Sequence, residues 1–122
     1  AGALDILRMI GLETKAQLRP AGLTQIEMRK LELARAMAAR PKLLISDEAM
    51  AGLSSAEVDD ILTILFRLNE QGITIIMIEH IMRAVMRFSE RIVVLDAGNR
   101  IAEGTPAEIV RNPAVEKAYL GE

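Results

Sequence analysis

Residues 41–48 have the sequence Pro41-Lys42-Leu43-Leu44-Ile45-Ser46-Asp47-Glu48. The short apolar run at 43–45, bounded by a proline and by acids, predicts a buried strand. A second run, residues 73–78, is rich in β-branched residues and is followed by Glu79 and His80. Because this run is almost wholly apolar, both of its faces are expected to be covered, as in a parallel sheet. Two buried strands that end in polar residues are therefore predicted.

Helical patterns lie before, between and after these strands. Helices are expected at 4–10, 24–39, 54–71 and 82–88, with shorter ones at 105–110 and 113–120. Thr24 and Glu27 have the spacing of an N-terminal capping box. A third strand at 92–95 and a tight turn at 97–99 lead into an antiparallel return at 100–102. This order predicts an α/β layered fold with right-handed βαβ units, preceded by a helical segment over residues 1–40.

Composition excludes several classes of protein. The 122 residues contain no Cys, 2% aromatic residues and a net charge of -2. A disulfide scaffold, a thiol nucleophile and a zinc site with Cys ligands are therefore excluded, and nucleic acid is not an expected partner. No apolar run approaches the length of a membrane span, and the N-terminus does not resemble a signal peptide. Because the chain does not begin with Met, a processed chain or a fragment is expected.

Chemistry is expected at the carboxyl ends of the two parallel strands, where open sheets bind ligands. Asp47 could hold Mg²⁺ while Glu48 orients and polarises a water for attack on a phosphate. His80, the only histidine, could donate a hydrogen bond to the same phosphate. The alternatives are a pair of solvated acids and a surface or helix-capping histidine.

Two further segments allow more than one interpretation. Residues 48–54 are rich in small residues and form either a flexible loop that another surface approaches or an ordinary strand–helix connection. Arg29, Lys30 and Arg35 could contact a phosphate, although a solvated helix face is the favoured interpretation. Residues 26–38 could also form an amphipathic helix that binds a partner.

Taken in order, these elements resemble the C-terminal half of an ABC-transporter nucleotide-binding domain. Residues 31–37 and 41–48 resemble the helix after the family signature and the Walker B strand, and residues 51–54 resemble the D-loop. Residues 73–80 are similar to the switch-histidine strand, and residues 92–106 to the closing strand and hairpin. The ending, 112–122, resembles the branched-chain amino acid importer ATPases most closely, with the lipopolysaccharide-export ATPase as a rival within the family.

The resemblance implies a partial P-loop NTPase (RecA-like) layered sheet. Residues 1–40 would be the end of a helical subdomain with the signature-like helix, and residues 41–122 the C-terminal half of the ATPase core. Asp47 would serve Mg²⁺, Glu48 would be the general base and His80 would contact the γ-phosphate of ATP.

The resemblance also implies contacts between subunits. Thr24, Gln25 and Glu27, in the signature, and Ser54, in the D-loop, would contribute to an ATP site shared with a second nucleotide-binding subunit. Transmembrane permease subunits would be the other partners. The implied location of this protein is cytoplasmic and peripheral, at the inner face of the cell membrane. The signature departs from Leu-Ser-Gly-Gly-Gln, because Gln25 and Ile26 replace two glycines and Glu27 adds a negative charge.

The chain contains no G-x-x-x-x-G-K-[ST] motif, so both ATP and Mg²⁺ would need an N-terminal half outside these residues. In the family the P-loop strand lies between the 73–78 and 92–95 strands. The isolated chain is therefore expected to pair these strands directly, to fill the gap from another copy, or to stay partly molten. Two other functions remain open: a non-catalytic interaction or regulatory half-domain, and a DNA-repair-type ABC ATPase, against which the charge balance and the tail argue.

Overall fold

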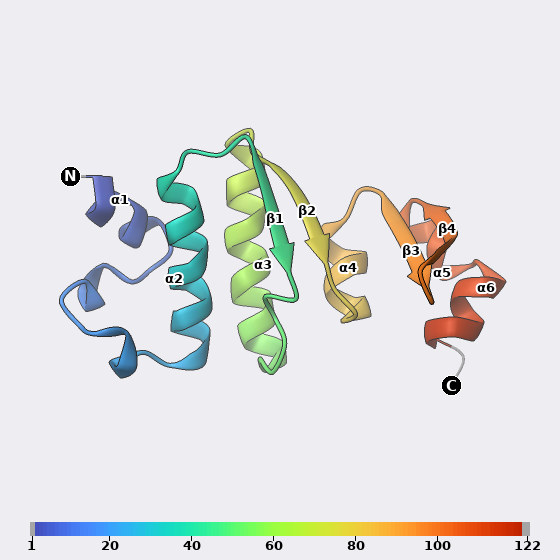
Figure 1. Cartoon of the computed structure of the whole chain (residues 1–122), viewed down its shortest axis with the longest axis horizontal. Coiled ribbons are helices and arrows are strands. Elements are labelled where there is room, and N and C mark those ends of the chain that lie inside the picture. The colour runs from blue at the N-terminus through green and yellow to red at the C-terminus, as the bar shows by residue number, and fades with distance from the viewer. Residues whose placement is uncertain (1, 121–122) are drawn as a thin grey trace. The chain divides into compact units, whose positions relative to one another are not determined.

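The computed structural model describes residues 2–120, and Figure 1 shows the order of their helices and strands. The chain forms two compact units, one ending at Glu79 and one beginning at His80. The first unit contains α1 (Gly2–Met9), α2 (Gln25–Ala38), β1 (Leu43–Asp47), α3 (Ser55–Glu70) and β2 (Thr74–Ile78). The second contains α4 (Met82–Phe88), β3 (Ile92–Asp96), β4 (Asn99–Gly104), α5 (Pro106–Val110) and α6 (Pro113–Val115), followed by a π-helical turn at Glu116–Leu120. The elements match the sequence predictions to within a few residues.

The first unit is built around the parallel pair of β1 and β2. Their register runs from Leu43 opposite Thr74 to Asp47 opposite Ile78, without a shift. Helix α3 connects the two strands, as parallel pairing requires. The predicted parallel strand pair is therefore confirmed.

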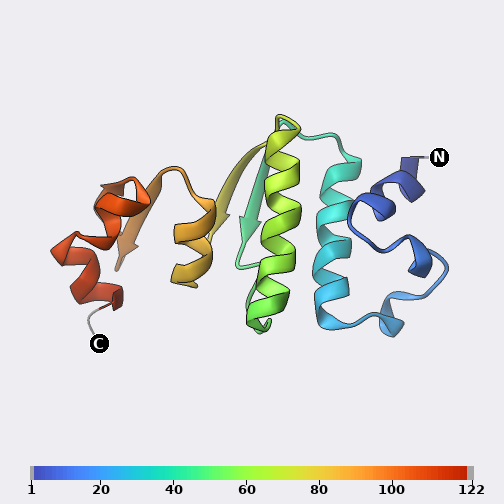
Figure 2. The same cartoon turned by 180° about the vertical axis from the view of Figure 1, so that it is seen from behind.

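Helix α3 supplies the core of this unit. The Ser54 hydroxyl accepts a hydrogen bond from the Glu57 N–H at 3.2 Å, and the Glu57 carboxylate accepts from the Ser54 N–H at 2.9 Å, which forms a capping box. Apolar residues at helical spacing line the buried side of α3, namely Val58, Ile61, Leu62, Ile64, Leu65 and Leu68. Figure 2 shows α3 lying across one face of the β1–β2 sheet.

The opposite face of the same sheet is open. Leu43, Ile45, Ile76 and Ile78 are 47%, 58%, 48% and 48% exposed, whereas Leu44 on the α3 side is 6% exposed. The expectation that both faces of these strands are covered is therefore wrong for the described chain. The reason is that neighbouring residues of a strand point to opposite faces, and α3 covers only one of them.

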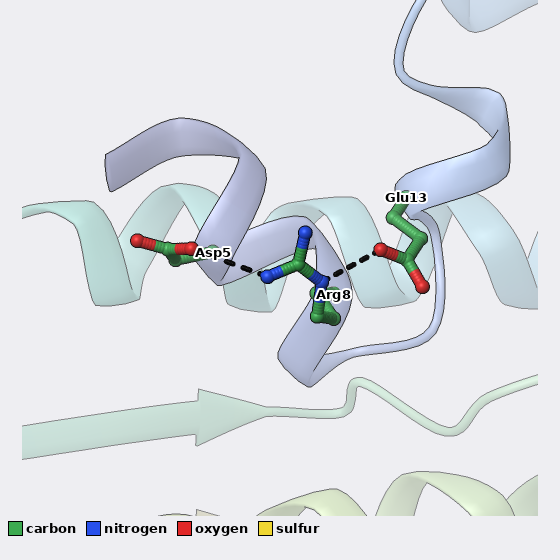
Figure 3. Close-up of polar contacts among 3 residues, drawn as sticks. All are labelled: Asp5, Arg8 and Glu13. Carbon is green, nitrogen blue, oxygen red and sulfur yellow. Dashed lines mark hydrogen bonds and ion pairs between the residues drawn. The ribbon is translucent and has the colours of Figure 1, made fainter. Parts of the chain in front are cut away.

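Helix α1 and the turn that follows it pack beside α2. Ile10 and Leu12 in this turn are buried, as are Leu33 and Met37 of α2. On the outer surface, the Arg8 guanidinium donates to Glu13 at 2.7 Å and reaches Asp5 at 3.5 Å, so that it links α1 to the next turn of the chain (Figure 3). All three side chains are largely exposed, so water and salt screen this ion-pair cluster and it contributes little to stability.

The capping box predicted for α2 is present. The Thr24 N–H donates to the Glu27 carboxylate at 2.8 Å, and the Glu27 N–H donates to the Thr24 hydroxyl at 3.3 Å. The Lys15 ammonium forms an ion pair with the same carboxylate. The hydrogen bond from Lys15, followed by the one from the Thr24 N–H, lowers the pKa of Glu27 from 4.5 to about 2. Glu27 therefore ties the start of α2 to the preceding segment.

The second unit is a β3–β4 hairpin covered by short helices. Its two-residue loop places Ala97 and Gly98 at φ 48° and 81°, which matches the twist of a tight hairpin. The core consists of Ile92, Val94, Ile109 and Val115, with Val85, Met86, Ile101 and Ala102 packed against it. The Tyr119 hydroxyl donates to the Leu95 carbonyl and fastens the π-helical turn to β3.

The described strands form two sheets, β1–β2 in the first unit and β3–β4 in the second. The three arrangements expected for the 73–78 and 92–95 strands of the isolated chain stay predictions.

The two faces of β1 give a matched pair of stability predictions. Leu44→Ala removes a buried side chain and should lower the free energy of unfolding by about 2–5 kcal/mol. Leu43→Ala removes a half-exposed side chain of the same type and should lower it by less than about 1 kcal/mol. Urea unfolding of both variants measures the difference, and equal losses would mean that the open face is covered in solution.

The ion pair at the start of α2 predicts a dependence on pH. Because the folded state holds the pKa of Glu27 below its unfolded value, the charged carboxylate stabilises the fold above about pH 4.5. This contribution should fall as the pH drops from 4.5 towards 2. Lys15→Met should raise the pKa of Glu27, measured by NMR titration of its carboxyl carbon. An unchanged pKa in this variant would remove Lys15 as the main cause.

Candidate functional site

Two acids stand at the carboxyl end of β1. Asp47 is the last residue of the strand, Glu48 follows it, and both are exposed. The Glu48 N–H donates to the Ile78 carbonyl at 2.8 Å, which continues the pairing with β2 beyond Asp47. The parallel register therefore places both acids at one edge of the sheet, next to the end of β2, which Glu79 directly follows.

Glu48 has an unusual backbone conformation. Its φ of 52° lies in the left-handed region, which a residue with a side chain adopts at a cost of about 1–3 kcal/mol. Such strain persists only where the surroundings enforce it, and it is concentrated at functional sites. We therefore expect contacts around Glu48 to keep its backbone in this conformation and so to set the direction in which the chain leaves β1.

Those contacts fix the loop that follows β1. Arg29 of α2 donates from Nη1 to the Glu48 carbonyl at 3.3 Å and from Nη2 to the Ala51 carbonyl at 3.1 Å. From the other strand, Glu79 Oε2 accepts the Met50 N–H at 3.3 Å, while the Met50 side chain is fully buried. The loop is thus held by the Arg29 guanidinium on two of its carbonyls and by the Glu79 carboxyl group on one of its amides.

For Arg29 the interpretation as part of a solvated helix face is wrong, since its guanidinium is used within the chain. For Arg35 the same interpretation is confirmed, because it pairs with Glu32 at 2.9 Å and both side chains are more than 60% exposed. The roles of Arg29 and Glu79 were missed by the sequence analysis. Arg29 lies four residues after Gln25, so both share one face of α2, but this spacing does not indicate which acceptors the guanidinium binds.

The signature-like residues at the start of α2 have partners in the same chain. Thr24 and Glu27 form the capping box, and Lys15 pairs with the charge of Glu27. Gly52 has φ 77°, and a Cβ built on it would lie 3.0 Å from Gln25 Nε2. The Gln25 side chain therefore reaches the loop after β1, and Ile26 is half-buried.

The remaining candidate residues lie elsewhere. Ser54 is exposed and is the N-cap residue of α3. His80 is the first residue of the second unit, two positions after Ile78, and it is exposed. The sites proposed for ATP contact at Thr24, Gln25, Glu27 and Ser54, and the catalytic role of His80, stay predictions.

The donor set at the end of β1 fits Mg²⁺ held jointly with phosphates. Among residues 2–120 no group of three or more His, Asp or Glu side chains is arranged to hold a metal. An exposed Asp47 carboxylate nevertheless suits Mg²⁺, which commonly takes one or two carboxylates together with substrate phosphate oxygens and water.

Among residues 2–120, none of the helices has the length and apolar content that a membrane span requires.

Comparison with known proteins gives matches along most of the chain. The chain is 46% identical over 97 residues to the high-affinity branched-chain amino acid transport ATP-binding protein BraF of Pseudomonas aeruginosa, covering 79% of this chain and 38% of BraF. It is 42% identical over 117 residues to LivG of Salmonella typhimurium, covering 95% of this chain and 46% of LivG. The methionine import ATP-binding protein MetN of Rhizobium etli is 38% identical over an alignment of 122 positions, covering 98% of this chain and 34% of MetN. The chain thus spans less than half the length of these relatives.

Family and structure comparisons agree with these matches. The family model of the branched-chain amino acid ATP-binding cassette transporter matches residues 99–122. The ADP conformation of MJ1267, an ATP-binding cassette of an ABC transporter, superposes with a TM-score of 0.91 at 29% identity, covering 99% of this chain and 49% of MJ1267. CbiO1 of Clostridium perfringens, part of the ABC transporter complex CbiONQ, has a TM-score of 0.84 at 26% identity, covering 95% of this chain and 47% of CbiO1. The chain therefore belongs to the ATP-binding cassette family and corresponds to the C-terminal half of the ATP-binding subunit of an ABC transporter.

Proposed function

We propose that this chain provides the Walker B acids, the D-loop and the switch histidine of an ATPase subunit that powers the uptake of branched-chain amino acids. The observation that carries the proposal is the acid pair Asp47 and Glu48, held at the carboxyl end of β1 by pairing with β2. The names of BraF and LivG and the family match at 99–122 support the choice of transported solute.

In this function each residue has a distinct task. Asp47 would help to hold Mg²⁺, which when bound neutralises charge on the β- and γ-phosphates of ATP. Glu48 would orient and polarise the water that attacks the γ-phosphate in line with the leaving oxygen. His80 would donate a hydrogen bond to a γ-phosphate oxygen as charge develops there.

A second copy of the subunit would complete the site. Thr24, Gln25 and Glu27 at the start of α2 would face the ATP bound by the partner subunit, and Ser54 would lie in the segment that touches this partner. Lys15 already neutralises the Glu27 carboxylate, which reduces the repulsion that Glu27 would exert on a polyphosphate. This dimer would lie at the inner face of the cell membrane. Transmembrane permease subunits would convert its closing and reopening into transport across the membrane.

The transported solute is the part of the proposal with rivals. MetN is a relative at 38% identity, compared with 46% for BraF and 42% for LivG. The family match over the last 24 residues favours branched-chain amino acids, whereas lipopolysaccharide export remains a rival on sequence grounds.

A non-catalytic interaction or regulatory half-domain is the second candidate function. It is favoured by one observation, namely that no G-x-x-x-x-G-K-[ST] motif occurs in the 122 residues. Without a P-loop, the backbone N–H cradle and the lysine that grip the β- and γ-phosphates are missing from this chain.

Titration of the 122-residue chain with MgATP tests this point. We expect no saturable binding in the micromolar range, measured by calorimetry, because the proposed site needs phosphate ligands outside these residues. Micromolar affinity would show that the chain grips the triphosphate by itself and would overturn this account of its dependence on a P-loop half.

The role of Glu48 is tested in the full-length subunit that joins this chain to a P-loop half. Glu48→Gln keeps the size of the side chain but removes the base, so turnover should fall by at least about a hundredfold while nucleotide binding persists. Glu70 is an exposed acid at the end of α3. Glu70→Gln is therefore the matched control and should leave turnover unchanged. Unchanged turnover in Glu48→Gln would remove Glu48 from the proposed role.

A further inference from the structure

The loop between β1 and α3 contains both the acid Glu48 and the D-loop-like segment, and a side chain from a distant part of the sequence holds it. Arg29 lies on α2, 19 residues before Glu48 and 22 residues before Ala51. Both of its acceptors are main-chain carbonyls, so the contact acts on the path of the backbone. Arg29 thus constrains the direction in which the chain leaves β1.

The geometry of the loop suits an arginine in particular. The Glu48 carbonyl accepts the Ala51 N–H at 3.4 Å, which closes a turn over residues 48–51. The Arg29 guanidinium donates to the carbonyls at the two ends of this turn, at 3.3 Å and 3.1 Å. A planar fork of donors can bind two acceptors in a fixed orientation, whereas a lysine ammonium acts as a point charge on a flexible stem.

The same contact bears on the strained conformation of Glu48. Glu48 has a left-handed φ of 52°. On its N-terminal side, the Glu48 N–H is fixed by a hydrogen bond to the Ile78 carbonyl at 2.8 Å. Arg29 holds the carbonyl on the other side of the same residue. Removing the guanidinium takes away one of the hydrogen bonds that the Glu48 carbonyl accepts and should let the backbone relax towards an unstrained conformation.

We propose that Arg29 is a positioning residue for Glu48. Through its two hydrogen bonds, Arg29 couples the first turns of α2 to the position of the Glu48 side chain. The inference rests on the proposed function of Glu48 as the base. Gln25, one turn before Arg29 on the same face of α2, lies beside Gly52 of the same loop, since a Cβ on Gly52 would be 3.0 Å from Gln25 Nε2. A displacement of the start of α2 would therefore be transmitted to the position of Glu48.

We call the two hydrogen bonds from Arg29 to the Glu48 and Ala51 carbonyls the Arg29 clamp. Amide hydrogen exchange on the 122-residue chain tests this clamp, without reference to ATP. In Arg29→Gln the hydrogen-bonded amides of Ala51 and Leu53 should exchange at least about tenfold faster, because the turn opens locally more often. Amides of the buried part of α3 should keep their rates, which shows that the variant is folded. Lys30→Gln removes the neighbouring charge and should leave the loop unchanged. Equal loop exchange in both variants would overturn the inference.

The consequence for catalysis is tested in the full-length subunit. Arg29→Gln should lower kcat about tenfold or more with little change in the KM for ATP, since a displaced base affects the chemical step. Arg29→Lys should recover part of the loss and Lys30→Gln should behave as the unmodified protein.

A parallel Glu48→Gln variant separates the two claims. If Glu48→Gln abolishes turnover while Arg29→Gln keeps the full kcat, the role of Arg29 is wrong and the role of Glu48 stands. If Glu48→Gln keeps its turnover, the proposed function of Glu48 fails. Faster loop exchange in Arg29→Gln would then support the clamp as a purely structural contact, and the positioning role would fall with the function.

Discussion

The parallel pairing of β1 with β2 is the constraint on which the candidate site depends. It brings residues that are some thirty positions apart in the sequence to one edge of a sheet, where Asp47 lies opposite Ile78. The bond from the Glu48 N–H to the Ile78 carbonyl extends this pairing into the loop. Only because the register is fixed can Glu79, just after β2, accept the Met50 N–H from the segment after β1.

Burial of the sheet is one-sided in the described chain. Helix α3 covers one face of the sheet and provides fully buried residues such as Ile61, Leu65 and Leu68. The other face keeps four apolar side chains about half exposed. The hydrophobic contribution to the stability of this unit therefore comes mainly from the α3 side, since exposed apolar area contributes little.

The signature-like residues at the start of α2 have contacts within the chain. The Glu27 carboxylate forms an ion pair with Lys15 and caps α2. The Gln25 side chain reaches towards Gly52 in the loop after β1. The start of α2 is thus tied both to the segment before it and to the loop that carries Glu48, so a change at one place affects the other.

Periodicity, capping residues and turn residues determined the elements and the strand ends, because these are local properties of the sequence. They were sufficient to predict the helix starting after Thr24, the helix starting after Ser54, the parallel pair and the placement of Asp47 and Glu48 at a carboxyl edge. The bare face of the sheet and the clamp of Arg29 on residues 48 and 51 could not be predicted in this way. Each depends on which surfaces meet in space, and a guanidinium that binds two main-chain carbonyls leaves no pattern in the sequence around either partner.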